Sequence, residues 1–291
     1  MKSTWFSRKP HHEFAKCLRE ADSSRSLWES FSDWLNLAYL SLSQAAHKVR
    51  TGSLDDAKEQ GYLELIGQYK NPSKMSEALA IVVNALEMDR YDFIGSAAGE
   101  LELLNQWNGQ FFTPKTVCDL MCQMTLGECR PDPEHRLRIA EPACGAGAMA
   151  IAATEVLKEN GFAPWHYWLD CTDIDHRMFK ACYIQLTLCG VPAVVRHGDT
   201  LRATQHRAEP TLVAVLHPYR YTAKELAEQE AAQKERETAE EAARIAANTL
   251  TLSTAQPLAV PARRPVPRPV ASTPKPTKPA PVGQAEFSLF P

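Results

Sequence analysis

Hydrophobic residues in the first hundred positions recur at steps of three and four, which is the spacing of one helix face. The clearest run consists of Leu27, Phe31, Trp34, Leu35, Ala38 and Leu42. A second helix is predicted from Lys74 to Met88, with Asn71 as its cap and Pro72 in its first turn. Residues 1–106 are therefore predicted to form a helical domain with an apolar core.

The pattern changes after residue 106, where short apolar stretches begin to alternate with helical ones. Leu137–Ala140 is a predicted buried strand, and an alanine-rich helix follows from Ala148. Between them, Gly145 and Gly147 allow the backbone to turn sharply and to approach a ligand closely, because neither carries a Cβ atom. A strand, a glycine turn and a helix form the nucleotide-binding start of a doubly wound sheet.

Further strands are predicted downstream of this turn. They are Tyr167–Thr172, Ala193–Arg196 and Thr211–Leu216, with a helix over Arg177–Leu188. Strands that alternate with helices indicate parallel pairing with crossover connections. The sequence therefore predicts an α/β fold with a doubly wound, mostly parallel, Rossmann-like sheet in residues 107–221.

A further helix is predicted upstream of the first strand. Thr113 is its expected cap, and Pro114 is its expected first residue. The apolar positions that share one face of this helix are Val117, Leu120, Met121 and Met124. Cys118 and Cys122 lie one turn apart on the same helix and are expected to be buried small apolar residues.

The composition changes again in the last seventy residues. Ala223–Ala247 is rich in alanine and charged residues and lacks a wide apolar stripe, so a solvated helix is predicted within residues 222–250. Residues 251–291 contain many prolines and basic residues, a composition that favours an extended, disordered tail. Such a tail is interpreted as a linker or solubilising segment, with non-specific binding to phosphates as the alternative.

Bulk properties limit the classes of function. The net charge of -3 gives no global attraction to nucleic acid, so any DNA contact would require local basic patches. The eight cysteines are scattered, and Cys118, Cys122 and Cys129 lack the fourth ligand of a zinc pattern. No metal site is predicted. No segment has the length and hydropathy of a signal peptide or membrane span, so a cytoplasmic protein is expected.

The glycine turn alone leaves several functions open. Gly145-x-Gly147-x-x-Ala150 fits the dinucleotide-binding fingerprint, with Asp173 as the acidic residue further along the chain. A tight turn in an ordinary α/β protein is the simpler interpretation. The flanking segments Gly109-Gln-Phe-Phe-Thr-Pro114 and Glu141-Pro-Ala-Cys144 separate these alternatives.

These two segments, in this order and spacing, resemble the adenine-N6 DNA methyltransferases, and in particular the modification subunits of type I restriction systems. The resemblance extends back to Tyr91-Asp-Phe-Ile-Gly95 and forward to Gly198-Asp-Thr-Leu201. It implies S-adenosyl-L-methionine as cofactor, DNA as substrate and a specificity or other restriction-modification subunit as partner. A dinucleotide-dependent oxidoreductase is disfavoured, because its chemistry requires neither of the flanking segments.

The resemblance also implies which residues bind the cofactor. The implied residues are Phe111, Phe112, Thr113, Pro114, Glu141, Pro142, Ala143, Cys144, Gly145, Gly147, Asp173, Ile174 and Asp199. In the family, the acid at the end of the second strand accepts the ribose hydroxyls, a role that falls to Asp173, with Asp175 as the alternative. Asp199 is expected to accept from the adenine amino group of the cofactor.

The family's catalytic loop, Asn/Asp-Pro-Pro-Tyr/Phe, is altered in this chain. The corresponding residues are Leu216-His-Pro-Tyr-Arg220, in which His217, Pro218 and Tyr219 are the catalytic candidates. The family's acceptor side chain holds the amino group of a base that is flipped out of the duplex. The resemblance therefore implies a DNA adenine-N6 methyltransferase with impaired catalysis. The alternative is an inactive protein that binds S-adenosylmethionine and associates with DNA or a partner.

A first prediction concerns the tail. Deletion of residues 255–291 should leave the melting temperature within about a degree or two of the full chain, because a proline-rich segment buries little apolar surface. Differential scanning calorimetry of the two chains measures this difference. A much larger decrease would show that the tail packs against the folded domain.

Overall fold

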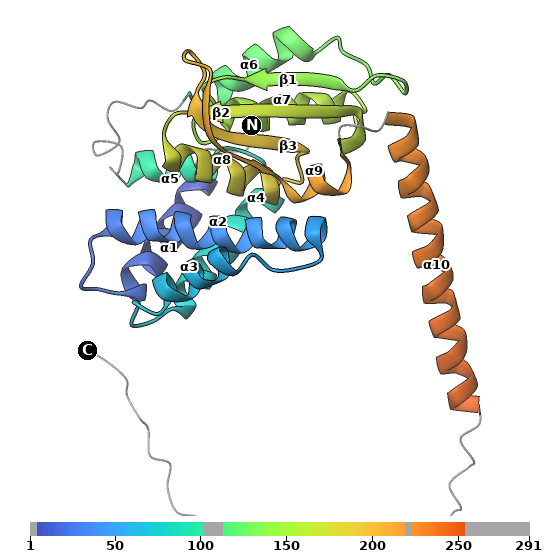
Figure 1. Ribbon diagram of the computed structural model, residues 1–291, viewed down its shortest axis with the longest axis horizontal. Coiled ribbons are helices and arrows are strands. Elements are labelled where there is room, and N and C mark those ends of the chain that lie inside the picture. Colours follow the sequence, from blue (N-terminus) through green and yellow to red (C-terminus); the bar gives the residue numbers. More distant parts are fainter. Residues whose placement is uncertain (1–4, 102–112, 219–222, 254–291) are drawn as a thin grey trace, which may run out of the picture. The chain divides into compact units, whose positions relative to one another are not determined.

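The computed structural model describes residues 5–101, 113–218 and 223–253 (Figure 1). Its helices are α1 (Trp5–Ala21), α2 (Leu27–Thr51), α3 (Asp56–Ile66), α4 (Ser73–Met88), α5 (Phe93–Glu100), α6 (Lys115–Leu126), α7 (Ala148–Glu159), α8 (His176–Leu188), α9 (Leu212–Leu216) and α10 (Ala223–Ser253), with a 3-10 turn η2 (Pro164–His166). Its strands are β1 (Leu137–Glu141), β2 (Tyr167–Asp173), β3 (Ala193–Asp199) and β4 (Thr204–Pro210).

The four strands form one sheet in the order β1-β2-β3-β4. The β1–β2 and β2–β3 pairs are parallel, with α7 and α8 as their crossover helices, and β4 is antiparallel to β3. This arrangement confirms the predicted α/β class with a mostly parallel sheet. The order runs in one direction from β1, so within the described residues β1 is an edge strand and one half of a doubly wound sheet is present.

The two faces of the sheet differ in burial. Residues that alternate along β2 and β3 are fully buried on one face, namely Leu169, Cys171, Ala193 and Val195. On the opposite face, the Asp170 carboxylate lies between two guanidinium groups, at 2.6 Å from Arg138 and 3.0 Å from Arg196. Apolar packing therefore supports one face of the sheet, and ion pairs run across strands on the other.

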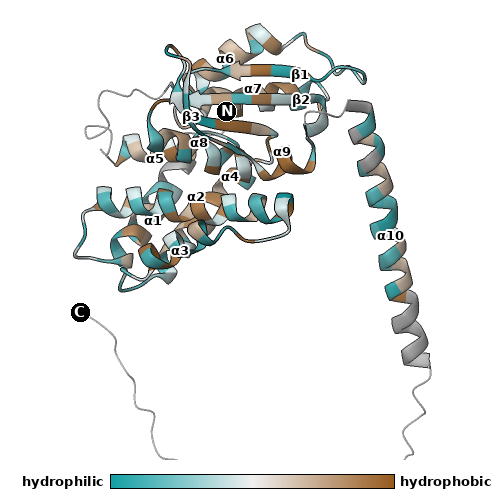
Figure 2. Cartoon of the chain, in the orientation of Figure 1, coloured by the Kyte–Doolittle hydropathy of each residue, from teal (hydrophilic) through white to brown (hydrophobic). Residues whose placement is uncertain are grey.

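The predicted fourth strand at Thr211–Leu216 is wrong, because Leu212–Leu216 forms the short helix α9. Thr211 caps this helix, since its hydroxyl oxygen accepts from the Ala214 amide at 3.3 Å. Figure 2 shows α9 as a hydrophobic segment, which explains why its residues resemble a buried strand. The strand position beside β3 is taken by β4, whose residues Thr204–Arg207 are exposed and show no apolar alternation.

Helices α1–α5 confirm the predicted helical character of the first hundred residues. The predicted face of α2 is buried at Phe31, Trp34, Leu35 and Ala38. Buried residues of α2 and α8 belong to one hydrophobic core, with the Tyr39 and Phe179 rings 5.4 Å apart. The helical region is thus packed against a crossover helix of the sheet.

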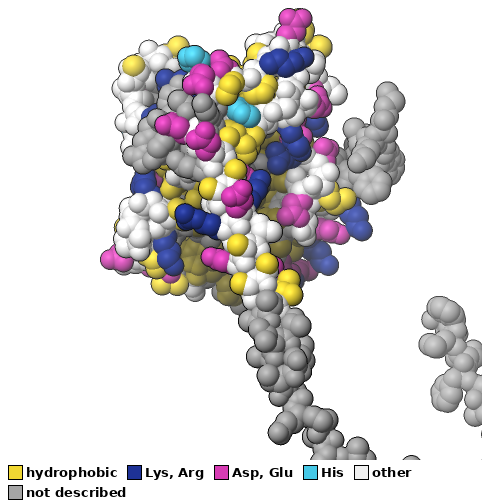
Figure 3. Space-filling view, turned by 90° about the vertical axis from the view of Figure 1, so that its right-hand side faces the viewer, with side chains coloured by type: hydrophobic (Ala, Val, Ile, Leu, Met, Phe, Trp, Pro, Cys, Tyr) yellow, Lys and Arg dark blue, Asp and Glu magenta, His cyan; other side chains and the backbone are white. Residues whose placement is uncertain are grey.

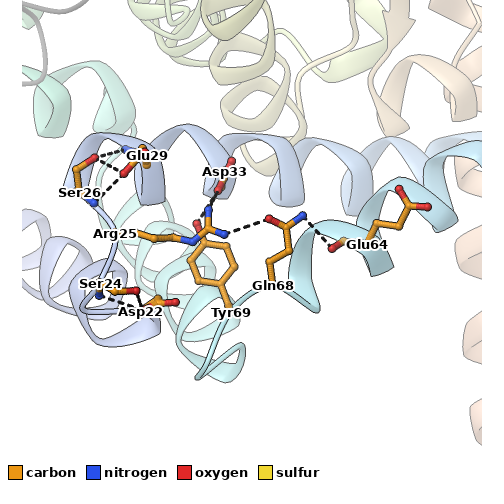
Figure 4. Close-up of polar contacts among 9 residues, drawn as sticks. All are labelled: Asp22, Ser24, Arg25, Ser26, Glu29, Asp33, Glu64, Gln68 and Tyr69. Carbon is orange, nitrogen blue, oxygen red and sulfur yellow. Dashed lines mark hydrogen bonds and ion pairs between the residues drawn. The ribbon is translucent and has the colours of Figure 1, made fainter.

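A polar network connects the turn between α1 and α2 to α2 and to the segment that follows α3 (Figure 4). The Arg25 guanidinium stands 4.7 Å from the centre of the Tyr69 ring and donates to Asp33 at 3.0 Å. Tyr69 donates its hydroxyl hydrogen to the same Asp33 oxygen at 2.8 Å. Ser26 and Glu29 form a capping box at the start of α2. These contacts fix the α1–α2 turn against the segment before α4.

Helix α6 confirms that Cys118 and Cys122 are buried, whereas the face with its larger apolar residues is exposed. Val117, Leu120, Met121 and Met124 are 42%, 61%, 50% and 80% exposed, respectively. The face that packs against α7 instead carries the two buried thiols of Cys118 and Cys122. Two small, buried cysteines a turn apart allow a close approach of α6 to α7.

Two predicted helix starts are shifted by one residue. Pro114, rather than Thr113, occupies the cap position of α6, and Pro72, rather than Asn71, occupies that of α4. Neither helix has a side-chain hydrogen bond at its cap.

Helix α10 confirms the predicted charged helix and continues to Ser253, beyond the expected boundary at residue 250. Its residues beyond Glu237 belong to a second structural unit. The predicted domain boundaries at 106/107 and 221/222, and the predicted tail beyond 253, lie outside the described residues. Among the helices that the structure describes, none has the length and hydropathy needed to cross a membrane.

A second prediction concerns His11, which connects α1 to α5. Its Nδ1 lies 2.7 Å from Glu100, its Nε2 lies 3.1 Å from the Tyr91 hydroxyl, and burial lowers its pKa below 6.5. His11 therefore binds a proton more readily in the unfolded chain than in the folded one. As a result, the free energy of unfolding should decrease as pH falls through 6.5. Urea unfolding at pH 7.5 and 5.5 measures the decrease.

His11→Asn should lose less stability over this pH range than the wild type. His135→Gln serves as the control, because the His135 side chain is 84% exposed. An equal pH dependence of the wild type and His11→Asn would contradict the prediction.

Candidate cofactor site

The predicted glycine turn joins the carboxyl end of β1 to the start of α7. Gly145 has φ 53° and Gly147 has φ 102°, both in the left-handed region that favours glycine. The Gly147 amide donates to the Cys144 carbonyl at 2.9 Å, which closes the turn. The backbone geometry expected at both glycines is therefore present.

The end of β2 holds this turn through backbone and side-chain contacts. The Cys144 amide donates to the Thr172 carbonyl at 3.0 Å, and the Gly145 amide donates to Asp173 Oδ2 at 2.8 Å. The other oxygen, Oδ1, accepts from the Asp175 amide at 2.9 Å. Burial raises the pKa of Asp173, and its two backbone hydrogen bonds oppose that rise. The Asp173 carboxylate thus positions the turn.

Two further elements hold the turn. Gln185 on α8 donates its side-chain hydrogen to the Ala146 carbonyl at 2.7 Å. Thr200, which follows β3, donates its hydroxyl hydrogen to the Pro142 carbonyl at 2.7 Å. The carboxyl ends of the parallel strands therefore meet at one place, where ligands bind in sheets of this class.

The structure separates the two acids that the sequence left as alternatives. Asp175 caps α8 by accepting from the Arg177 amide at 2.7 Å, and its other oxygen accepts from the Arg177 guanidinium at 2.9 Å. Asp173 instead contacts the glycine turn. Ile174, between them, is 63% exposed. An exposed aliphatic side chain beside a buried acid provides an apolar surface for a ring.

Asp199 lies at the carboxyl end of β3, as predicted. Its Oδ1 accepts from the amides of Leu201 and Arg202, and its Oδ2 accepts from the Arg202 guanidinium at 2.8 Å. The Arg202 contacts, led by its backbone amide, lower the pKa of Asp199. A ligand that bound this carboxylate would therefore compete with Arg202.

The end of the upstream segment 109–114 lies close to the turn. Thr113 and Pro114 line a cavity together with Ala148, the first residue of α7. Phe111 and Phe112 lie outside the described residues. At the turn itself, Glu141 Oε1 accepts from the Ala143 amide at 3.4 Å, and Cys144 is only 6% exposed. Cys144 therefore takes part in the turn through its backbone rather than its thiol.

The two catalytic candidates that the structure describes, His217 and Pro218, lie at the other end of the sheet. The carbonyl oxygens of His217 and Pro218 accept from the Arg136 guanidinium at 3.2 and 3.1 Å. Arg136 directly precedes β1, and a five-residue strand spans about 16 Å. The structure therefore does not bring His217 and Pro218 to the glycine turn, because the chain folds into α9 before them. Tyr219 lies outside the described residues.

Two buried polar residues near the turn were missed by the sequence analysis. Gln185 is completely buried, and Asp92 at the start of α5 is 8% exposed. The available signal was a glutamine on the apolar face of α8 and an aspartate within the Tyr91–Gly95 segment. Within the described part of the chain, no group of three His, Cys, Asp or Glu residues is arranged to bind a metal.

Comparison with known families accounts for this arrangement. The sequence pattern of the family "N-6 DNA Methylase" matches residues 100–251, which is more than half of the chain. The chain belongs to the N-6 DNA methylase family. S-adenosyl-L-methionine is the cofactor of this family. Among curated proteins, no relative matches the sequence.

Two solved structures show distant similarity. A putative class I S-adenosylmethionine-dependent methyltransferase from Listeria monocytogenes is 12% identical, with a TM-score of 0.37, over 66% of this chain and 54% of that one. A type I restriction-modification system methyltransferase subunit from Streptococcus thermophilus is 15% identical, with a TM-score of 0.32, over 64% and 56%. The chain thus matches about half the length of each.

A third prediction tests the geometry of the turn. A Cβ atom at Gly147 would lie 3.3 Å from the Cys182 sulfur, whereas one at Gly190, which also has a positive φ, would meet nothing within 4 Å. Gly190→Ala should therefore cost about 1–2 kcal/mol of backbone strain, and Gly147→Ala should cost more.

Urea unfolding of both variants measures the difference, and Cys182→Ala in the Gly147→Ala background should recover part of it. Equal losses for the two glycine variants would show that Cys182 does not crowd the turn.

Proposed function

We propose that this N-6 DNA methylase family member binds S-adenosyl-L-methionine at the glycine turn. The observation that carries the proposal is the convergence of Asp173, Gln185 and Thr200 on the backbone of the turn. A turn held in this way presents the start of α7 to a ligand without needing to rearrange. Such preorganisation reduces the free energy that binding requires.

The residues present fit the cofactor. Helix α7 begins at Ala148, and its cap residue Gly147 provides no side-chain hydrogen bond, so the amides of its first turn can receive the cofactor's carboxylate. Asp173 can accept from the ribose hydroxyls through its remaining lone pairs, beside the exposed Ile174. When bound, the cofactor supplies an electrophilic methyl group. Thr113 and Pro114 would close the site from the α6 side.

Because the chain belongs to the N-6 DNA methylase family, we propose that its substrate is DNA and that adenine N6 accepts the methyl group. Methyl transfer by the isolated chain should be slow, because His217 and Pro218 lie at the amino end of β1. A specificity or other restriction-modification subunit is the proposed partner. The face shown in Figure 3 mixes basic and acidic side chains, so DNA binding there would not rest on a field of one sign.

The second candidate function is cofactor binding without transfer, by a protein that associates with DNA or a partner. The position of the His217–Pro218 segment favours it. A transfer assay on DNA with labelled cofactor separates the two candidates.

A fourth prediction concerns cofactor binding. Asp173→Ala should weaken binding of S-adenosylmethionine by about 1–3 kcal/mol, because it removes charge-assisted hydrogen bonds and the support of the Gly145 amide. Isothermal titration calorimetry measures this change. Asp175→Asn preserves the cap of α8 and should leave the dissociation constant unchanged. Absence of binding by the wild type at millimolar cofactor would end the proposal.

A fifth prediction concerns transfer. The purified chain should methylate DNA about 10²–10³ times more slowly than a complete family member, the loss expected for one missing acceptor at a transition-state site. His217→Ala should not change the residual rate, because this side chain lies near Trp165, with ring centres 6.0 Å apart, rather than at the turn. A normal rate that depended on His217 would refute the proposed loss of transfer.

A further inference from the structure

A cavity of about 160 Å³ lies between α5, α6 and α7, next to the glycine turn. Its lining includes Asp92 and Ser96 from the α5 segment, Thr113 and Pro114 before α6, and Ala148 at the start of α7. The cavity is therefore bordered by the predicted cofactor loop, by the amino end of α7, which has no side-chain cap, and by the buried acid Asp92.

The two carboxylate oxygens of Asp92 differ in their hydrogen bonding. Oδ1 accepts from the Gly95 amide at 2.7 Å and from Gln185 Nε2 at 2.8 Å. No group in the described part of the chain donates to Oδ2. The residue is only 8% exposed and lines the cavity. Oδ2 is not among the fully buried atoms that lack a partner, so this oxygen is accessible to a ligand in the cavity.

Gln185 fixes the distance between this carboxylate and the turn. Its Nε2 donates both to Asp92 Oδ1 at 2.8 Å and to the Ala146 carbonyl at 2.7 Å. Its Oε1 accepts from the Ile94 amide at 3.1 Å, which sets the orientation of the amide group. A single amide nitrogen of Gln185 thus bonds to both Asp92 and the backbone of the turn, and it keeps the two close together.

We propose that Asp92 binds the ammonium group of the methionine part of S-adenosylmethionine, while the first turn of α7 binds the carboxylate. This inference rests on the proposed function. An α-amino acid carries opposite charges on one carbon, so its recognition requires an acceptor and a donor set a few ångströms apart. Asp92 and the α7 amides meet this requirement from two sides of one cavity.

Other charged groups at the cavity are already paired. Asp119 pairs with Lys115 at 3.0 Å, and its side chain is 46% exposed. Arg90 pairs with Glu155 at 3.3 Å. Asp92 is thus the buried acid of the cavity that has no cation beside it among the described residues. Burial raises its pKa, and a bound ammonium group would stabilise its charged form.

A purely structural role for Asp92 would not require its charge. Its Oδ1 caps α5, and an asparagine oxygen could accept the same two hydrogen bonds. Asp92→Asn therefore preserves the cap and the Gln185 contact, and it removes the negative charge that faces the cavity. This variant separates cofactor recognition from folding.

The test compares three ligands by calorimetry on the wild type and on Asp92→Asn. S-adenosylmethionine has the ammonium and the carboxylate, decarboxylated S-adenosylmethionine keeps only the ammonium, and methylthioadenosine has neither. Asp92→Asn should weaken the first two by roughly tenfold to a hundredfold, the scale of a charge-assisted hydrogen bond, and leave methylthioadenosine unchanged. The melting temperature of the variant checks its fold.

Several outcomes would overturn the assignment. Equal weakening of all three ligands would show that Asp92 acts only through the structure of the turn, and unchanged binding would remove it from the site. If the wild type bound methylthioadenosine as tightly as S-adenosylmethionine, the ammonium subsite would fail while adenosine binding at the proposed site remained. Binding of none of the three would instead refute the proposed function itself.

Discussion

The geometry of the site depends on one constraint, the left-handed backbone of the turn between β1 and α7. Gly145 and Gly147 allow this conformation but do not select it, because a glycine-rich segment has many alternatives in the unfolded chain. Selection comes from side chains of other elements. Asp173 from β2 and Gln185 from α8 each bond to the backbone of the turn. Formation of the sheet and placement of the proposed cofactor site are therefore linked.

Gln185 extends this link to the helical region. Its amide group connects the turn to Asp92 and to the backbone of α5, residues that lie more than ninety positions upstream. At the other end of α5, Glu100 contacts His11 on α1. The helical region is thus part of the framework of the site. An isolated sheet with its crossover helices would lack one wall of the cavity.

The sequence was sufficient for features that depend on local patterns. The glycine turn, β1 and α8 follow from apolar spacing and from residues that stop or bend the chain. It was insufficient where long-range contacts decide. β4 pairs with β3 although its exposed residues show no alternation, and the apolar residues of α9 form a helix because Thr211 caps them. At α6, the close approach to α7 through Cys118 and Cys122 left the larger apolar residues exposed.

The candidate site residues also differ in whether a local pattern or a long-range contact identifies them. Thr113, Asp173 and Asp199 are placed near the expected strand and helix ends, because the resemblance supplied their register. Asp92 and Gln185 could not be assigned, since their significance lies in a contact between distant parts of the chain. Sequence patterns mark a buried polar residue as unusual, but only the fold shows which group it meets.

Cofactor binding and methyl transfer make different demands on the fold. Transfer requires the donor and the acceptor to be held in one crevice. In a doubly wound sheet the second wall of that crevice comes from strands beyond β1, where the strand order reverses. In the described residues β1 is an edge, and Arg136 holds the His217–Pro218 segment at its amino end. The groups proposed to bind the cofactor do not depend on strands beyond β1, because they come from the α5 segment, the residues before α6, α7 and β2. The proposed binding of the cofactor and the proposed methyl transfer therefore rest on different parts of the fold.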